Sequence, residues 1–215
     1  MIFLATGGIV GYAQWKEKKR QASFIKQVDR KLTAEDQKIY EDKLAAAETG
    51  FNDAKNDDEK FDWTMEKATV LSGLGRLAQA RLVFESAIAI KPQNYVGYFA
   101  LFQVLQEMND NQSALSSIKK VMEIKPENPA NWRSYITFEK ERLHASNPEL
   151  NSLYIEALAK THSNIDIITV YAQFLESIGN LQESKEYWQK AIIAFPPNTS
   201  LYQVEIDRLN KKSGK

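Results

Sequence analysis

The chain of 215 residues has no cysteine, and this absence excludes disulfide bonds, thiol catalysis and cysteine-based zinc sites. Glycine and proline are scarce, with nine and six residues, and the prolines lie near the ends of predicted helices. The chain also lacks an excess of either charge, because 28 basic residues balance 28 acidic ones. Nucleic-acid-binding proteins usually have a basic excess or a basic stripe. We therefore expect no nucleic-acid partner.

Sequence patterns typical of β-strands are also rare. The chain has no alternating apolar runs bounded by Asn-Gly or Asp-Gly turns. Long windows instead place apolar residues at i, i+3, i+4 and i+7, which is the spacing of an amphipathic helix. A hydrophobic content of 43% is enough for a sizeable core. The predicted fold class is all-α.

One pattern of small, aromatic and proline residues returns along the chain. It first appears in LGRLAQARLVFESAIAIKP, residues 74–92. It returns 34 residues later, and again two periods and two residues after that, with a weaker copy in between. The matching residues are Ala80, Phe84, Ala87 and Pro92; Ala114, Ile118, Val121 and Pro126; Tyr154 and Ala157; and Ser184, Trp188, Ala191 and Pro196.

A period of 34 residues made of two helices and a turn resembles the tetratricopeptide repeat (TPR). The resemblance covers residues 61–196 and implies an α-solenoid of three to four helix-turn-helix repeats with flanking capping helices. The small residues let paired helices approach closely, and the aromatic residues fill the space beside them. Gly75 and Gly179 fit a tight turn that needs a positive φ, and the prolines end the second helix of each pair.

The predicted organisation has repeats in the middle and other segments at both ends. The repeats are residues 61–94, 95–128, 129–164 and 165–196, of which the third is irregular. Residues 33–60 are predicted to form an N-terminal helix or a degenerate half repeat, which begins at a capping-box-like Thr33. Residues 197–215 are predicted to form a capping helix, with Thr199 or Ser200 as its N-cap, and a basic tail.

The first 15 residues, MIFLATGGIVGYAQW, are apolar and precede the basic residues KEKKR. As a helix they span roughly 22 Å, less than the roughly 30 Å hydrocarbon core of a bilayer. We interpret residues 1–15 as a marginal or truncated transmembrane anchor, and therefore predict a single-pass membrane protein. A cleaved signal peptide and an apolar helix packed on the repeats are the alternatives.

The segment of residues 16–32 is basic, with seven basic and two acidic residues over positions 16–31. Taken alone, this charge places the flank in the cytoplasm. Lysines upstream of Met1 would reverse the orientation. The side of the membrane that carries the repeats is therefore left open.

No constellation of catalytic residues is recognisable. His144 and His162 are the only histidines, and neither belongs to a metal-binding motif. We interpret both as surface or loop residues. No set of nucleophile, base and orienting residue is present, so we expect neither an enzyme nor a cofactor or metal site.

In the TPR family, the first helix of each pair lines a concave groove that binds peptides. The resemblance implies that a protein or peptide is the partner. The corresponding positions here are Met65 and Thr69, Phe99 and Gln103, Arg133, Thr137 and Lys140, and Thr169 and Gln173. The Lys-Asn pairs with which one subclass holds a C-terminal carboxylate are absent from these positions. Phe99 and Met65 favour an apolar anchor on the partner, and Arg133 or Lys140 favours an acidic group.

These observations predict a membrane-tethered module that binds a protein or peptide in its groove. Its role would be that of a scaffold or adaptor in assembly, secretion or envelope organisation. The alternative is a structural or self-associating helical scaffold whose groove has no specific ligand.

Overall fold

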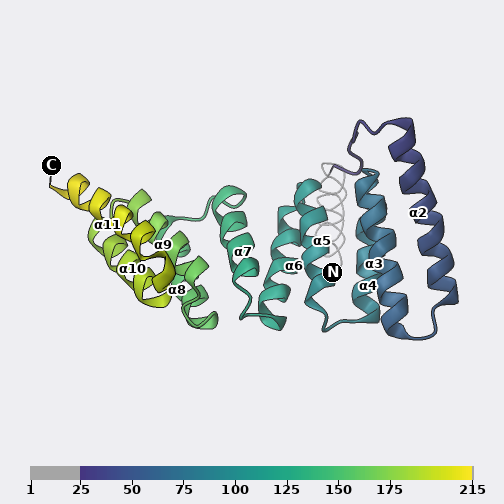
Figure 1. The fold of residues 1–215 in the computed structure, drawn as a ribbon. Helices are drawn as coiled ribbons and strands as arrows, with labels where there is room; N and C mark the ends of the chain where they lie inside the picture. Colours follow the sequence, from purple (N-terminus) through teal and green to yellow (C-terminus); the bar gives the residue numbers. More distant parts are fainter. Residues whose placement is uncertain (1–24, 215) are drawn as a thin grey trace, which may run out of the picture. The chain divides into compact units, whose positions relative to one another are not determined.

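The computed structural model describes residues 25–214. This part of the chain forms ten α-helices and one short 3-10 helix, and it contains no strand (Figure 1). The prediction of an all-α fold is therefore confirmed. The helices are α2 (Ala34–Asp53), α3 (Asp57–Gly73), α4 (Leu77–Ile90), α5 (Tyr95–Glu107), α6 (Asn111–Ile124), α7 (Pro129–Glu141), α8 (Asn147–Lys160), α9 (Ile165–Ser177), α10 (Leu181–Ala194), η1 (Pro196–Asn198) and α11 (Thr199–Ser213).

The chain divides into two compact units, Met1–Lys120 and Val121–Lys215, and the division falls within α6. In the first unit, α2 packs on α3, α3 on α4, and α4 on α5 (Figure 1). Ala68, Ala80 and Ala87 are completely buried at these contacts, and Phe84 is 3% exposed. The small residues bring the helix backbones close together, and the aromatic ring fills the remaining space.

The second unit repeats this arrangement with α7 to α11, each of which packs on the next helix. Ser184 is completely buried on α10, and its hydroxyl donates a hydrogen bond of 2.8 Å to the carbonyl oxygen of Ala172 on α9. The ring of Tyr154 lies 5.2 Å from that of Tyr171 and 5.0 Å from that of Phe174, measured between centroids. Aromatic packing of this kind stabilises the core of the unit.

The turns follow the prediction made from glycine and proline. Gly75 has a φ of 74° and Gly179 a φ of 86°, so both adopt the left-handed conformation that glycine tolerates best. Helices α4, α6 and α10 end two residues before Pro92, Pro126 and Pro196.

Helix capping is predicted correctly at one end of the array and wrongly at the other. The Thr33 hydroxyl caps α2 by accepting a hydrogen bond of 3.0 Å from the Asp36 amide. Helix α11 begins at Thr199 after Asn198, without a side-chain cap. The Thr199 hydroxyl instead donates to the carbonyl oxygen of Pro196 at 2.7 Å. The preceding 3-10 turn supplies this acceptor and takes the hydroxyl away from the helix amides.

The structure contradicts the predicted single-pass membrane location. Between residues 25 and 214, no helix is both long and apolar enough to cross a bilayer. Residues 1–15, on which the prediction was based, and residues 16–24 of the basic segment lie outside the described residues.

An irregular segment, residues 25–32, lies across the turn between α3 and α4, and we call it the crossing segment. The Val28 amide donates to the Gly75 carbonyl oxygen at 2.9 Å, and the Ala78 amide donates to the Lys26 carbonyl oxygen at 3.0 Å. A third bond joins the Ile25 amide to the Met108 carbonyl oxygen at 3.0 Å. These backbone hydrogen bonds fix the crossing segment to the ends of α3, α4 and α5.

Candidate protein-interaction surface

In the first unit, four of the predicted groove residues lie in pairs on α3 and α5. Met65 and Thr69 are one helical turn apart, as are Phe99 and Gln103, so each pair shares one face of its helix. Met65 and Phe99 are half-buried, whereas Thr69 and Gln103 are exposed. The accessible surface of these two helices is therefore partly apolar and partly polar, without charge at the four positions.

In the second unit, the predicted groove residues lie on α7 and α9. Arg133, Thr137 and Lys140 are exposed at a spacing of four and three residues along α7, so they share one face of the helix. On α9, Thr169 is half-buried and Gln173 is exposed. This surface differs from that of the first unit because it carries two positive charges.

The Arg133 guanidinium lies close enough to the buried Tyr154 side chain to affect its pKa. Burial raises the pKa of the Tyr154 hydroxyl, and the nearby Arg133 guanidinium partly opposes this increase. Burial also raises the pKa of Tyr171 to about 12. Both tyrosines stay neutral at physiological pH, so they add no charge to that of Arg133 and Lys140 on this surface.

The structure brings each group of predicted residues together on its own helix. All nine side chains keep some exposure, while neighbours on the same helices, such as Ala68, Leu101 and Ile136, are buried. Accessibility is what a binding surface requires, but it does not identify a ligand. The assignment of these nine residues to a binding groove therefore stays a prediction.

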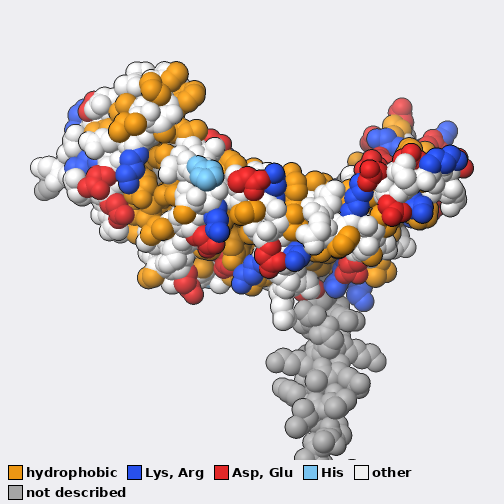
Figure 2. All heavy atoms as spheres, turned by 90° about the horizontal axis from the view of Figure 1, so that it is seen from below, with side chains coloured by type: hydrophobic (Ala, Val, Ile, Leu, Met, Phe, Trp, Pro, Cys, Tyr) orange, Lys and Arg blue, Asp and Glu red, His pale blue; other side chains and the backbone are white. Residues whose placement is uncertain are grey.

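No grouping of at least three potential metal ligands of the His, Cys, Asp or Glu type occurs within residues 25–214. His144 and His162 are exposed and have φ angles of 55° and 52° in the segments that follow α7 and α8. The interpretation of both as loop residues at the surface is confirmed. On the face drawn in Figure 2, acidic and basic side chains alternate without a broad patch of either sign.

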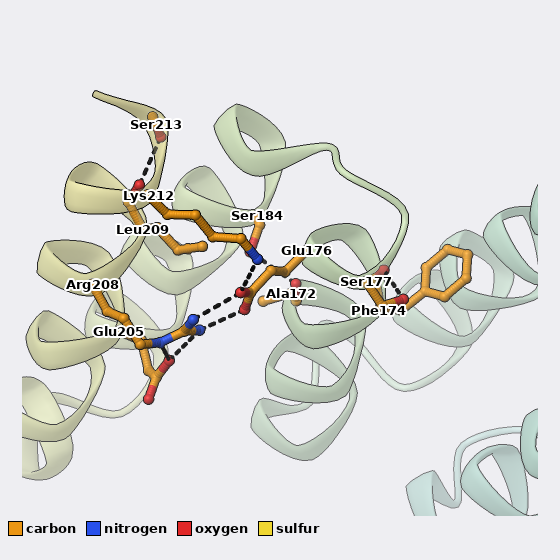
Figure 3. Close-up of polar contacts among 10 residues, drawn as sticks. All are labelled: Ala172, Phe174, Glu176, Ser177, Ser184, Glu205, Arg208, Leu209, Lys212 and Ser213. Atoms are coloured by element: carbon orange, nitrogen blue, oxygen red, sulfur yellow. Dashed lines mark hydrogen bonds and ion pairs between the residues drawn. The ribbon is translucent and has the colours of Figure 1, made fainter. Parts of the chain in front are cut away.

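The strongest electrostatic cluster described in the second unit joins α9 to α11 (Figure 3). The Glu176 carboxylate accepts hydrogen bonds of 2.7 and 2.5 Å from the Arg208 guanidinium and one of 3.0 Å from Lys212. The hydrogen bonds from Arg208 lower the pKa of Glu176 to about 2, although burial acts in the opposite direction. This cluster fixes the terminal helix to the last repeat.

Sequence reasoning missed an apolar surface on α2 and α3. Phe51 and Trp63 are 41% and 38% exposed, although Phe51 has the spacing of the buried aromatic residue in the repeats. In the sequence, the glycine at position 50 was the one sign that α2 is approached closely by a neighbour. The structure shows that neighbour, because a Cβ atom on Gly50 would lie 2.2 Å from the Trp63 ring. Because glycine has no side chain, the Trp63 indole packs directly against α2. In this position the indole lines an open pocket.

Comparison with known proteins agrees with this architecture. Residues 65–94 match the family model of the tetratricopeptide repeat. No curated protein sequence matches the chain. Many solved structures do match, at low sequence identity.

Three of these structures illustrate the likeness. BtubC from P. vanneervenii is 12% identical with a TM-score of 0.58, and the match covers 85% of each chain. A MamA RS-1 ArsTM double mutant is 14% identical with a TM-score of 0.54, over 75% of this chain and 88% of that one. Pseudomonas aeruginosa pilF is 20% identical with a TM-score of 0.53, over 74% and 71%.

Likeness at these identities shows the fold alone, which is that of a helical-repeat array. Proteins with this fold are generally interaction modules and not enzymes. Residues 65–94 therefore match one tetratricopeptide repeat, and the helical-repeat fold of the described residues is consistent with an array of such repeats.

Proposed function

We propose that the protein is a scaffold or adaptor that binds a segment of a partner protein on the first helices of its repeats. The observation that carries this proposal is the exposure of all nine predicted positions on helices whose neighbouring residues form the core. Regularly spaced accessible side chains on successive helices are the usual binding surface of a helical-repeat array.

The chemistry of the two units indicates what the partner segment contains. In the first unit, Met65 and Phe99 present partly exposed apolar groups, and the Phe99 ring is supported by that of Phe102 at 6.0 Å. In the second unit, Arg133 and Lys140 present positive charges. A partner segment with a large apolar side chain and an acidic group satisfies both surfaces.

Two substitutions test this proposal together. We expect Phe99→Ala with Arg133→Glu to reduce capture of the partner about tenfold or more, because one anchor is removed and one charge is reversed. Capture is measured with the tagged full chain in extracts of the source cells, and the captured proteins are quantified by mass spectrometry.

The matched control is Leu82→Ala with Lys160→Glu, which removes one exposed apolar and one exposed basic side chain from the second helices α4 and α8. Circular dichroism checks that both variants keep the helical content of the wild type. If both variants captured the partner as well as the wild type does, the first-helix surface would not be the binding site.

A further inference from the structure

A pocket of about 530 Å³ lies in the first unit, with its lining contributed by α2, α3 and α4. Its apolar lining residues are Phe51, Trp63, Val83 and Ile90. None of the nine groove residues contributes to it. A pocket of this size with two partly exposed aromatic rings accepts one or two large apolar side chains from a partner.

Two of the three helices that line the pocket, α2 and α3, are strongly acidic. Helix α2 has six acidic and two basic residues, a net charge of −4, and α3 has five acidic and two basic residues, a net charge of −3. At the pocket itself, Glu48 forms an ion pair of 2.9 Å with Lys67. Asp62 and Glu66 on α3 are exposed. The chemistry therefore favours an occupant whose apolar side chains are followed by basic ones.

Helix α11 has this composition on the side that faces away from α10. Leu201 and Val204 are each 61% exposed, three residues apart, and therefore lie on one face. Lys211 is exposed seven residues after Val204, two helical turns further along the same side. Asp207 is also exposed on this side, where its carboxylate accepts a hydrogen bond of 2.9 Å from the Gln203 side chain. With three basic and two acidic residues, α11 has a net charge of +1. The other side of α11 is covered, since Tyr202, Ile206 and Leu209 are buried.

We propose that α11 of one copy docks on the pocket of a second copy. Leu201 and Val204 enter the apolar pocket formed by Phe51, Trp63 and the residues of α4. Lys211 then lies near the acidic surface of α2 and α3. The donor helix and the acceptor pocket are different parts of the chain, so the contact is heterologous and adds copies in one direction.

Light scattering on the full chain over a range of concentrations tests this proposal. The wild type is expected to increase in mass with concentration to at least a dimer. The variant Leu201→Glu with Val204→Glu lacks the donor face, and Phe51→Glu lacks the acceptor face. Each variant is expected to stay monomeric by itself. Ile155→Glu, at a side chain that is 52% exposed on α8, is the control and associates as the wild type does.

An equal mixture of the two monomeric variants distinguishes this contact from a symmetric one. Each variant keeps the face that the other lacks, so the mixture is expected to form a dimer. Lys211→Glu is expected to raise the dissociation constant about three- to fivefold, in line with the loss of an exposed ion pair, and Asp62→Lys in the partner copy is expected to offset this loss.

A wild type that is monomeric at every concentration would overturn the proposal. So would a mixture that stays monomeric, or association that survives Phe51→Glu. These variants leave the nine first-helix residues unchanged, so capture of the partner protein is expected to persist in them. A failure of this proposal is thereby distinguishable from a failure of the proposed function.

Discussion

The turn of the first repeat and the turn of the last repeat have the same backbone structure. In the first, the Gly75 amide donates to the Ser72 carbonyl oxygen and the Leu77 amide to the Gly75 carbonyl oxygen, both at 2.9 Å. In the last, the Gly179 amide donates to the Glu176 carbonyl oxygen at 3.0 Å, and the Leu181 amide to the Gly179 carbonyl oxygen at 2.9 Å. The same spacing of glycine after the first helix produces the same turn.

The two turns differ in what lies next to them. A Cβ atom on Gly75 would be 1.9 Å from the Val28 carbonyl oxygen of the crossing segment, whereas nothing lies within 4 Å of the same position on Gly179. The last turn is instead fixed through the Glu176 side chain, which binds α11. Equivalent positions of the repeat thus hold different end segments in place, one through the backbone and one through a side chain.

The largest effect is expected from Gly75→Ala, for which Gly179→Ala is the matched comparison. Gly179→Ala places an alanine at a positive φ and is expected to cost about 1–2 kcal/mol of stability. Gly75→Ala adds a clash with Val28 to the same strain, and is expected to cost about 3–4 kcal/mol because the crossing segment must leave the turn. The midpoints of urea unfolding measure this difference.

Limited trypsin digestion of Gly75→Ala and Gly179→Ala tests locally whether the crossing segment has left the turn. Lys26, Arg30 and Lys31 lie in the crossing segment, so its release exposes three cleavage sites. Cleavage there is expected to accelerate in Gly75→Ala and to stay at the wild-type rate in Gly179→Ala. Equal acceleration in both variants would show that the crossing segment does not depend on the first turn.

An intermediate effect is expected from Glu176→Gln at the last turn. The folded-state pKa of about 2 lies below the ordinary value of 4.5. The carboxylate therefore stabilises the fold above about pH 4.5, and this contribution is lost as the pH falls from 4.5 towards 2. We expect Glu176→Gln to cost about 1–2 kcal/mol at pH 7, a value reduced by the exposure of Arg208. At pH 2 the cost is expected to be close to zero.

Urea unfolding of wild type and Glu176→Gln at pH 7, 4 and 2 measures this change. Glu186→Gln, on an exposed residue of α10, is the control for loss of a carboxylate. A difference between wild type and Glu176→Gln that does not depend on pH would contradict the assigned ion pairs.

The smallest effect is expected from Arg30→Ala in the crossing segment. The Arg30 guanidinium donates to the Ser72 carbonyl oxygen at 3.0 Å and to the Glu107 carboxylate at 2.5 Å. Both contacts are partly exposed, so their loss is expected to cost about 1 kcal/mol and to accelerate tryptic cleavage at Lys26 modestly. Lys38→Ala, an exposed change on α2, is expected to leave both measurements unchanged.

The repeated core was predictable because it depends on spacing alone. Ala80, Ala114 and Ser184 are completely buried, as their place in the 34-residue pattern predicts. The position of the crossing segment was not predictable from the sequence. Most of its contacts are backbone hydrogen bonds, which do not require a recognisable pattern of side chains. The pocket was missed for a related reason: spacing places Phe51 on a helical face but does not say which neighbour covers it.

The C-terminal helix shows the same limit. Leu201, Val204 and Leu209 are spaced so that they lie roughly on one side of a helix, yet only Leu209 is buried. A heptad-like pattern indicates an apolar side of a helix, and two adjacent apolar stripes on one helix are hard to separate from sequence. In α11 one stripe packs on α10 and the other stays exposed.

The central claim is that the first helices carry the binding surface, and site-specific photo-crosslinking tests it most directly. A photoreactive residue is placed in turn at Gln103 and Thr137 on the first helices, and at Leu82 and Ile155 on the second helices, all of which are exposed. After irradiation in the source cells, crosslinked proteins are identified by mass spectrometry. We expect one shared partner from Gln103 and Thr137, and no protein other than a second copy of the chain from Leu82 and Ile155. The same partner from all four positions, or a partner from Leu82 and Ile155 alone, would contradict the claim.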